Sequence, residues 1–218
     1  MSIDDNGIAH IDIKGSLLDN AAPIYEMIGS TDYRTLRKEI AEAQDAKAIM
    51  FNVDSPGGTV AGLEEASEAI ASSNVPTVAY CDGMSCSAAY HLSASADNIV
   101  ASPSADVGNI GTVLSWYDDS AFMESIGYSN EGMTNEGADL KGTFRDTPMT
   151  DSQREFLQEE TDRIGAEFQQ HVIANRPNID SEVFRAGWYH GTRAGELGLV
   201  DAIGSESGAY AMLANAVS

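Results

Sequence analysis

Two short, almost wholly apolar runs constrain the fold of this chain more than any other feature of its sequence. Residues 48–53, AIMFNV, and residues 75–81, VPTVAYC, have the length and continuity typical of strands covered on both faces. Residues 61–72, which lie between them, are predicted to form a helix. This alternation favours an α/β fold, with a mostly parallel sheet and crossover helices.

Each of the two predicted strands is followed by glycine. Residues 54–58, DSPGG, follow the first strand, and residues 82–87, DGMSCS, follow the second. Open α/β sheets bind their ligands beyond the carboxyl ends of the strands. Both segments are therefore candidates for a functional site, although the first on its own is also explained as a tight turn that closes a buried strand.

The remaining predicted elements come from periodicity and capping residues. Residues 7–14 alternate apolar and polar side chains, which predicts a half-buried strand that ends at Gly15. Asp32 is the predicted N-cap of a helix over residues 33–46. The other expected elements before residue 128 are a loop with a short helical piece (16–31), two strands (98–101 and 113–117) and a short helix (120–127).

A long amphipathic helix is predicted in the last third of the chain. Thr150 or Asp151 would cap it, and it would run to about Asn175 with an apolar stripe. The stripe consists of Phe156, Ile164, Phe168 and Val172. Residues 128–149 before it are predicted to be a mostly exposed connection with limited strand. After it we expect a short helix capped by Asp180 or Ser181, then a turn, a short helix and a strand over residues 188–201.

Charge and length exclude several classes of function. The chain has 218 residues, which suits a single domain, and a formal charge of −22 from 34 acidic and 12 basic residues. Nucleic acid and anionic membrane surfaces select for clustered Lys and Arg, so neither is an expected partner. No apolar run reaches the ~18 residues of a membrane span, and the acidic start MSIDDNG is unlike a signal peptide. We therefore expect a protein of the cytoplasm or of the interior of an assembly.

The cysteines and histidines do not predict a metal or a cofactor site. Cys81 and Cys86 are five residues apart, on either side of the predicted glycine turn, and are interpreted as buried reduced thiols. The four histidines have no spacing typical of paired ligands. We expect no metal and no cofactor.

Ser87 lies where a predicted strand turns into a helix of small residues, SAAYHLSAS, which is the position of an activated nucleophile on an elbow. The alternative is a small-residue helix that simply packs in the core. A serine nucleophile also needs a base. His91, one helical turn further on, is interpreted as a packed helix histidine, and neither His10 nor His190 has a local reason to meet Ser87.

Lysine is the other candidate for the base. Lys14, Lys38 and Lys47 occupy ordinary positions at the ends of strands or on a helix, whereas Lys141 lies in a glycine-bracketed segment, GADLKG. A solvated loop lysine remains the alternative for Lys141. The glycines of the DSPGG segment offer backbone N–H groups that can face an oxyanion.

Taken together and in this order, these segments resemble peptidase family S49, the signal peptide peptidase A group and its phage relatives, within the ClpP/crotonase superfamily. The resemblance covers residues 7–204, within a single expected domain over residues 1–218. It depends on DSPGG (54–58), DGMSCSAAYHLSASAD (82–97), GNIG (108–111), the lysine segment and GTRAGELGLVD (191–201). It implies a ClpP/crotonase-like fold and a serine peptidase without a cofactor.

The resemblance also implies roles for particular residues. Ser87 would be the nucleophile and Lys141 the general base of a Ser-Lys dyad. The oxyanion hole would consist of the N–H of Ala88 with that of Gly58, or less favourably that of Gly57. The substrate cleft would be lined by Thr59 and by an extended edge of Gly108, Asn109, Ile110, Gly111 and Thr112, to which a peptide could add as a strand.

Two departures from the family pattern bear on this interpretation. Asn109 stands where the family commonly has serine, so an amide replaces a hydroxyl that often supports the lysine. Ala88 and Ala89 stand where the bacterial signal-peptide-degrading members usually have two glycines, which resembles the phage branch.

The resemblance to the phage branch implies a capsid maturation protease that cuts scaffold or coat precursors in the host cytoplasm or the assembling head, and that forms a homo-oligomer. Alternatives are a cellular peptidase of the same family or a non-catalytic assembly protein that kept the fold. A ClpP-type Ser-His-Asp peptidase is disfavoured by Thr112, where its histidine would stand. A crotonase-type enzyme needs no serine on the elbow.

Overall fold

The computed structural model describes residues 1–129, 132–141 and 148–217. The chain forms two compact units. The first, here called the sheet unit, comprises Met1–Gly111 and Phe168–Ser218, and the second, here called the connecting unit, comprises Thr112–Glu167. Ser87 belongs to the sheet unit and Lys141 to the connecting unit.

A nine-stranded sheet organises the sheet unit. Its main order is β1-β2-β4-β5-β6-β9, and every neighbouring pair along it is parallel except β1 with β2. These strands are β1 (Ser2–Ile3), β2 (Ile8–Leu18), β4 (Ala48–Gly58), β5 (Thr77–Cys86), β6 (Asn98–Ala101) and β9 (Ala202–Ile203). The predicted α/β fold with a mostly parallel sheet is confirmed.

Three short strands complete the sheet beside these. They are β3 (Thr31–Asp32), which pairs with β2, and β7 (Asp106–Gly108) and β8 (Trp188–His190), which pair with each other. β7 also pairs in parallel with the last residues of β5, where Cys86 lies opposite Gly108. The carboxyl ends of β4, β5 and β7 therefore meet in one region of the sheet.

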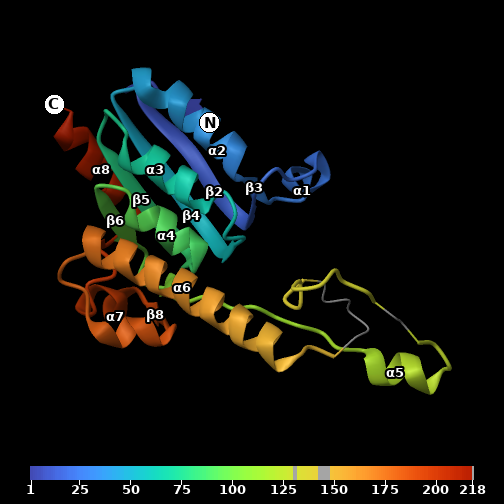
Figure 1. Ribbon diagram of the computed structural model, residues 1–218. Helices are drawn as coiled ribbons and strands as arrows, with labels where there is room; N and C mark the ends of the chain where they lie inside the picture. The colour runs from blue at the N-terminus through green and yellow to red at the C-terminus, as the bar shows by residue number, and fades with distance from the viewer. Residues whose placement is uncertain (130–131, 142–147, 218) are drawn as a thin grey trace. The chain divides into compact units, whose positions relative to one another are not determined.

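Helices cover both faces of the sheet (Figure 1). On one face α2 (Tyr33–Glu42), α3 (Leu63–Ala71) and α4 (Ala88–Ala94) enclose the larger apolar core, which includes Ile11, Phe51 and Tyr90. On the other face α8 (Glu206–Ala216) packs Ala209 and Leu213 against the strands. The other helices in the described part of this unit are α1 (Pro23–Met27), the last part of α6 (Asp151–Asn175), α7 (Gly191–Glu196) and the 3-10 segments Ala43–Asp45 and Ser181–Arg185.

Several predicted boundaries change because strands pair beyond their apolar runs. β2 continues past Gly15 to Leu18 through a register shift between Lys14 and Ser16. β4 and β5 likewise continue through the segments predicted as turns, to Gly58 and Cys86. Pairing with neighbouring strands satisfies the backbone groups of these polar residues, so the strands do not need apolar side chains there.

The connecting unit is built from helix and irregular chain. It holds α5 (Ser120–Ser125) and the first part of α6 (Asp151–Asn175), both of which were predicted. The strand predicted over residues 113–117 is wrong, since none of these residues is in a strand and Val113 and Tyr117 are largely exposed. Of the predicted connection over residues 128–149, 130–131 and 142–147 lie outside the described residues, and the described remainder contains no strand.

Candidate active site

Ser87 is held in a backbone conformation that side chains rarely adopt. Its φ is 55° and its ψ is −125°, directly between β5 and α4. Hydrogen bonds restrain both sides of the residue, from Ser87 N–H to Gly108 O at 2.9 Å and from His91 N–H to Ser87 O at 3.0 Å. A strained, non-glycine residue at such a turn is typical of a nucleophile elbow, where the surrounding structure holds the residue in its unfavourable backbone conformation.

Gly57 packs directly against Ser87. A Cβ atom on Gly57 would lie 2.7 Å from Ser87 Cβ and 3.0 Å from Ala88 N, and the φ of Gly57 is +104°. Only glycine fits this contact and this conformation. The DSPGG segment and the elbow, separated by a helix and most of a strand in sequence, are thus brought together at the carboxyl ends of β4 and β5.

Ser55 sets the conformation of this segment, a role that the sequence analysis missed. Its fully buried hydroxyl donates to Gly15 O at 2.6 Å and accepts from Gly57 N–H at 3.1 Å. The N–H of Gly57 is therefore already engaged. The sequence signal for this role of Ser55 is its position two residues before Gly57. That spacing could not reveal the bond to Gly15 of β2.

Gly58 and Thr59 leave the sheet beside β2. A Cβ atom on Gly58 would overlap Leu17 O, so a side chain there would clash with backbone. Thr59 N–H donates to the same carbonyl at 2.9 Å, and Tyr33 Oη donates to Thr59 O at 2.9 Å. The backbone at Gly58 and Thr59 is therefore held by Leu17 of β2 and by Tyr33 of α2.

The predicted cleft edge is anchored to the loop before β8. Asn109 has a φ of 54°, its N–H donates to Gly187 O at 2.7 Å, and its side-chain amide donates to Ala186 O at 3.2 Å. Ile110 is fully buried. β7 ends at Gly108 with neighbours on both sides, so any peptide that adds as a strand would have to do so beyond that residue.

The two cysteines are buried and free, as predicted. Burial raises the pKa of Cys81 and that of Cys86 to about 11 each. The Sγ of Cys86 also donates weakly to Asp106 O at 3.5 Å. Both thiols therefore stay protonated at neutral pH, and Cys86 does not compete with the adjacent Ser87 as a nucleophile.

His91 is a packed core histidine, as predicted. Its ring stacks on that of His171, with centroids 3.7 Å apart and planes 7° apart, and it also touches Phe168. Burial lowers the pKa of His91 to about 3 and also lowers the pKa of His171. The other two histidines lie close to carboxylates, His10 to Asp4 at 3.5 Å and His190 to Asp106 at 2.8 Å.

The lysines differ in their surroundings. Lys14 pairs with Asp12 at 3.1 Å and Lys38 with Glu42 at 3.7 Å, while the aliphatic part of Lys47 packs beside Gly7. Lys141 and the cleft candidate Thr112 both belong to the connecting unit. The side chain of Lys141 is exposed, and its N–H donates to Ala138 O at 3.0 Å, which makes it the last residue of a tight turn.

The parallel sheet, its crossover helices and the strained elbow at its carboxyl edge define an α/β protein of the Clp protease-like class. Sequence models agree, because the model of the Clp protease family matches residues 11–107 and that of peptidase family S49 matches residues 69–218. The chain belongs to peptidase family S49, a family of serine peptidases.

Curated relatives come from cells and from phages. MJ0651 of Methanocaldococcus jannaschii is 29% identical over 83% of this chain and 60% of its own length. Protease 4 of Haemophilus influenzae is 27% identical over 92% of this chain and 33% of its own length. Capsid assembly protease C of Escherichia phage lambda is 26% identical over 97% of this chain and 50% of its own length. The chain thus spans between a third and three fifths of these relatives.

Solved structures share the fold at low identity. The 1510-N membrane-bound stomatin-specific protease, in a serine mutant, superposes with a TM-score of 0.57 at 13% identity, over 96% of this chain and 86% of that one. A lysine mutant of the same protease, in complex with a substrate peptide, gives a TM-score of 0.55 over 97% and 81%. Within the described part of this chain, no helix has the length and apolarity needed to span a bilayer.

Proposed function

We propose that this protein is a serine endopeptidase in which Ser87 is the nucleophile and Lys141 the general base. The observation that carries the proposal is the strained Ser87 elbow packed against Gly57 in a member of peptidase family S49. Strain of this kind costs free energy and persists where function requires it. The proposal treats residues 1–218 as a single peptidase domain.

In this mechanism the neutral amine of Lys141 accepts the proton of Ser87 Oγ while that oxygen attacks the peptide carbonyl carbon. The carbonyl π electrons move to the oxygen, and the N–H groups of Ala88 and Gly58 stabilise the resulting oxyanion. Gly58 is preferred to Gly57 because the N–H of Gly57 already donates to Ser55 Oγ. The lysine then protonates the leaving amine, and water releases the acyl group by the same steps.

Substrate would lie along the stretch from Gly108 to Thr112 and beside Thr59. The main chain of Asn109 is already anchored to Gly187 and its amide to Ala186. We therefore assign Asn109 the role of holding this edge in shape, in place of the support for the lysine amine that serine commonly gives in the family. Small and apolar substrate side chains would suit a cleft edge that has glycine at positions 108 and 111.

The biological role that we propose is maturation of a phage or prophage capsid. The lambda relative, a capsid assembly protease, matches nearly all of this chain, and a second relative is the head-tail preconnector protein GP5 of Enterobacteria phage P21. Scaffold or coat precursors would then be the substrates and the assembling capsid the place of action. The cellular relatives named Protease 4 support a signal-peptide-peptidase-like role as the second candidate.

A homo-oligomer is part of the proposal. The connecting unit exposes several large apolar side chains, of which Val113 is 87% and Met133 96% exposed, and a second copy of the chain would cover such a surface. Light scattering over a range of concentrations tests this, and a monomer at every concentration would contradict it.

The catalytic proposal is tested by comparing the wild type with Ser87→Ala, Lys141→Ala and the control Lys38→Ala. Cleavage of a denatured, fluorescently labelled casein is the assay, with circular dichroism to confirm folding. We expect Ser87→Ala and Lys141→Ala each to lose at least about 10³-fold in kcat, as in other enzymes that depend on an activated serine. Lys38→Ala should match the wild type, because Lys38 is an exposed helix residue.

Activity that persists in Ser87→Ala would exclude the serine mechanism, and activity that persists in Lys141→Ala would exclude this base. To separate the two roles, the wild type is incubated with a purified capsid scaffold protein and with a synthetic signal peptide. Preferential cleavage of the scaffold protein supports capsid maturation, and preferential cleavage of the signal peptide supports the cellular role.

A further inference from the structure

The start of α6 carries a capping box whose glutamine makes one bond more than the box requires. In the sequence TDSQ, Gln153 N–H donates to Thr150 Oγ1 at 3.3 Å and Thr150 N–H donates to Gln153 Oε1 at 3.1 Å. This reciprocal pair satisfies backbone donors at the helix N-terminus. The amide nitrogen of Gln153 remains free for another partner.

That partner is the main-chain carbonyl of Asp139, fourteen residues earlier. Gln153 Nε2 donates to Asp139 O at 3.1 Å. Since Oε1 can only accept and Nε2 can only donate, the two partners also determine the orientation of the amide. Gln153 is 8% exposed, and of the described residues in the connecting unit it alone is buried.

Asp139 lies within a pair of consecutive tight turns that ends at Lys141. Ala138 N–H donates to Asn135 O at 3.1 Å, and Lys141 N–H donates to Ala138 O at 3.0 Å. Asp139 is therefore an inner residue of the second turn, whose last residue is Lys141. A bond that fixes the carbonyl of Asp139 restrains the backbone from which the lysine side chain extends.

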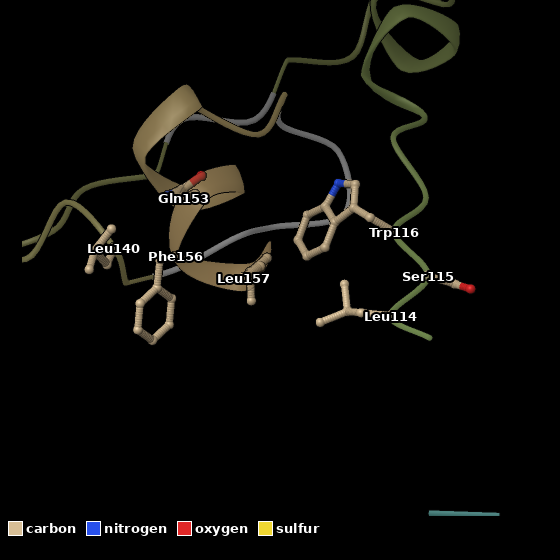
Figure 2. A pocket seen from close by; sticks show the side chains of 7 residues that line it. All are labelled: Leu114, Ser115, Trp116, Leu140, Gln153, Phe156 and Leu157. Carbon is tan, nitrogen blue, oxygen red and sulfur yellow. The ribbon is translucent and has the colours of Figure 1, made fainter. Parts of the chain in front are cut away.

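The side chain of Leu140, which lies between Asp139 and Lys141 in sequence, is directed to the first turns of α6. It lines a cavity of about 280 Å³ together with Phe156 and Leu157 of α6 and with Leu114 and Trp116 (Figure 2). Gln153 lies on the first turn of the helix at this cavity. The segment before Lys141 thus meets α6 through one hydrogen bond from its backbone and one apolar side chain.

We propose that Gln153 is a positioning residue for the reaction, which holds the Lys141 turn against the start of α6 through the carbonyl of Asp139. This inference rests on the proposed role of Lys141 as the base. It also explains the choice of side chain. Glutamate would complete the capping box equally well and would suit the positive end of the helix, but an ionised carboxylate has no proton to donate to Asp139 O.

Three variants of the full chain separate positioning from capping. Gln153→Glu keeps the capping box and loses the bond to Asp139 O. Gln153→Met loses the bond to Asp139 O and the side-chain half of the box without adding charge, while the backbone N–H of residue 153 can still donate to Thr150 Oγ1. Thr150→Ala removes the hydroxyl acceptor of the box and leaves the bond to Asp139 O. Each variant is assayed for kcat and KM on one peptide substrate, for the pH profile of kcat/KM and for melting temperature.

We expect Gln153→Glu and Gln153→Met to lose roughly 10- to 100-fold in kcat, the range typical of a misplaced catalytic group, with KM little changed and the acid limb of the pH profile displaced. Thr150→Ala should keep the kcat and pH profile of the wild type while its melting temperature falls by about 2–4 °C. Gln153→Glu should melt close to the wild type.

Wild-type kcat and pH profile in Gln153→Glu would overturn the inference. So would wild-type kinetics in Gln153→Met, since the effect in Gln153→Glu would then come from the added charge. A loss of kcat in Thr150→Ala as large as in Gln153→Glu would assign Gln153 a structural role only. Lys141→Ala separates these outcomes from the catalytic proposal. If Lys141→Ala is active, Lys141 is not the base. If Lys141→Ala is inactive, the Gln153 variants decide whether Gln153 positions Lys141.

Discussion

The two units of this protein hold their proposed catalytic residues by different means. In the sheet unit, Ser87 is enclosed by the ends of three strands, and its environment consists largely of backbone groups and of glycine. In the connecting unit, Lys141 ends a surface turn that meets α6 through the bond from Gln153 and the side chain of Leu140. Dense packing can impose strain on a residue, whereas a surface turn depends on each single contact.

The comparison predicts that small substitutions around Ser87 cause a large loss of unfolding free energy, and that substitutions in the lysine segment cause a small one. Substitutions at Gly57, His91 and Gly137 test this difference, and the expected loss of unfolding free energy decreases from Gly57→Ala to Gly137→Ala.

Gly57→Ala should cause the largest loss. Its Cβ would lie 2.7 Å from Ser87 Cβ and 2.8 Å from Cys86 O, at a φ of +104°. Overpacking and backbone strain together should cost more than about 3 kcal/mol of unfolding free energy. Denaturant titration measures this loss. A variant that unfolds at the same denaturant concentration as the wild type would show that the elbow is not tightly enclosed.

His91 makes the stability of the sheet unit depend on pH. Burial lowers the pKa of His91 from 6.5 in the unfolded chain to about 3. The unfolded state therefore binds more protons between these values, and the free energy of unfolding falls as pH falls below 6.5. Between pH 6.5 and about pH 5 the loss should be about 1.6 kcal/mol from this residue.

His91→Phe is the matched variant, because it keeps an aromatic ring against His171 and Phe168. Its unfolding free energy should be less sensitive to pH over the same range, with the remaining slope due to His171, whose pKa burial also lowers. Urea titrations at several pH values provide the measurement. An unchanged slope in His91→Phe would contradict the assignment.

Gly137→Ala should have the smallest effect. Gly137 lies in the turns before Lys141 with a φ of +79°, and no atom lies within 4 Å of the position that a Cβ would occupy. Only the backbone cost of a positive φ remains, about 1 kcal/mol. Denaturant titration beside Gly57→Ala tests the contrast directly. Equal losses in the two variants would remove the distinction between the units.

Local signals in the sequence predicted the helices well. Asp32 caps α2 by accepting from the N–H groups of Arg34 and Thr35, and Thr150 bonds the N–H of Gln153 at the start of α6, both as expected. These contacts join residues only a few positions apart, so residue type and spacing are sufficient to predict them.

Strand ends and the last helix were less predictable. The polar residues 54–58 resemble a turn, yet Gly57 and Gly58 pair with Ser16 and Leu17 of β2. Residues 113–117 have the composition of a strand but find no partner strand. No element was predicted after residue 204, where α8 forms and packs on the second face of the sheet. Strand pairing and helix docking depend on distant segments, and periodicity within one segment does not contain that information.

Short-range patterns and ordered motifs encode the α/β fold, the peptidase family and the place of Ser87 at a strand-to-helix turn, so the sequence was sufficient to predict these features. Only the tertiary structure showed that Gly57 and Gly108 enclose Ser87, that Ser55 engages the N–H of Gly57, and that Gln153 bonds the turn of Lys141. The contacts of Gly57, Gly108 and Gln153 join residues from different segments, and the Ser55 hydroxyl also bonds Gly15 O of β2, so their geometry exists only once the chain has folded.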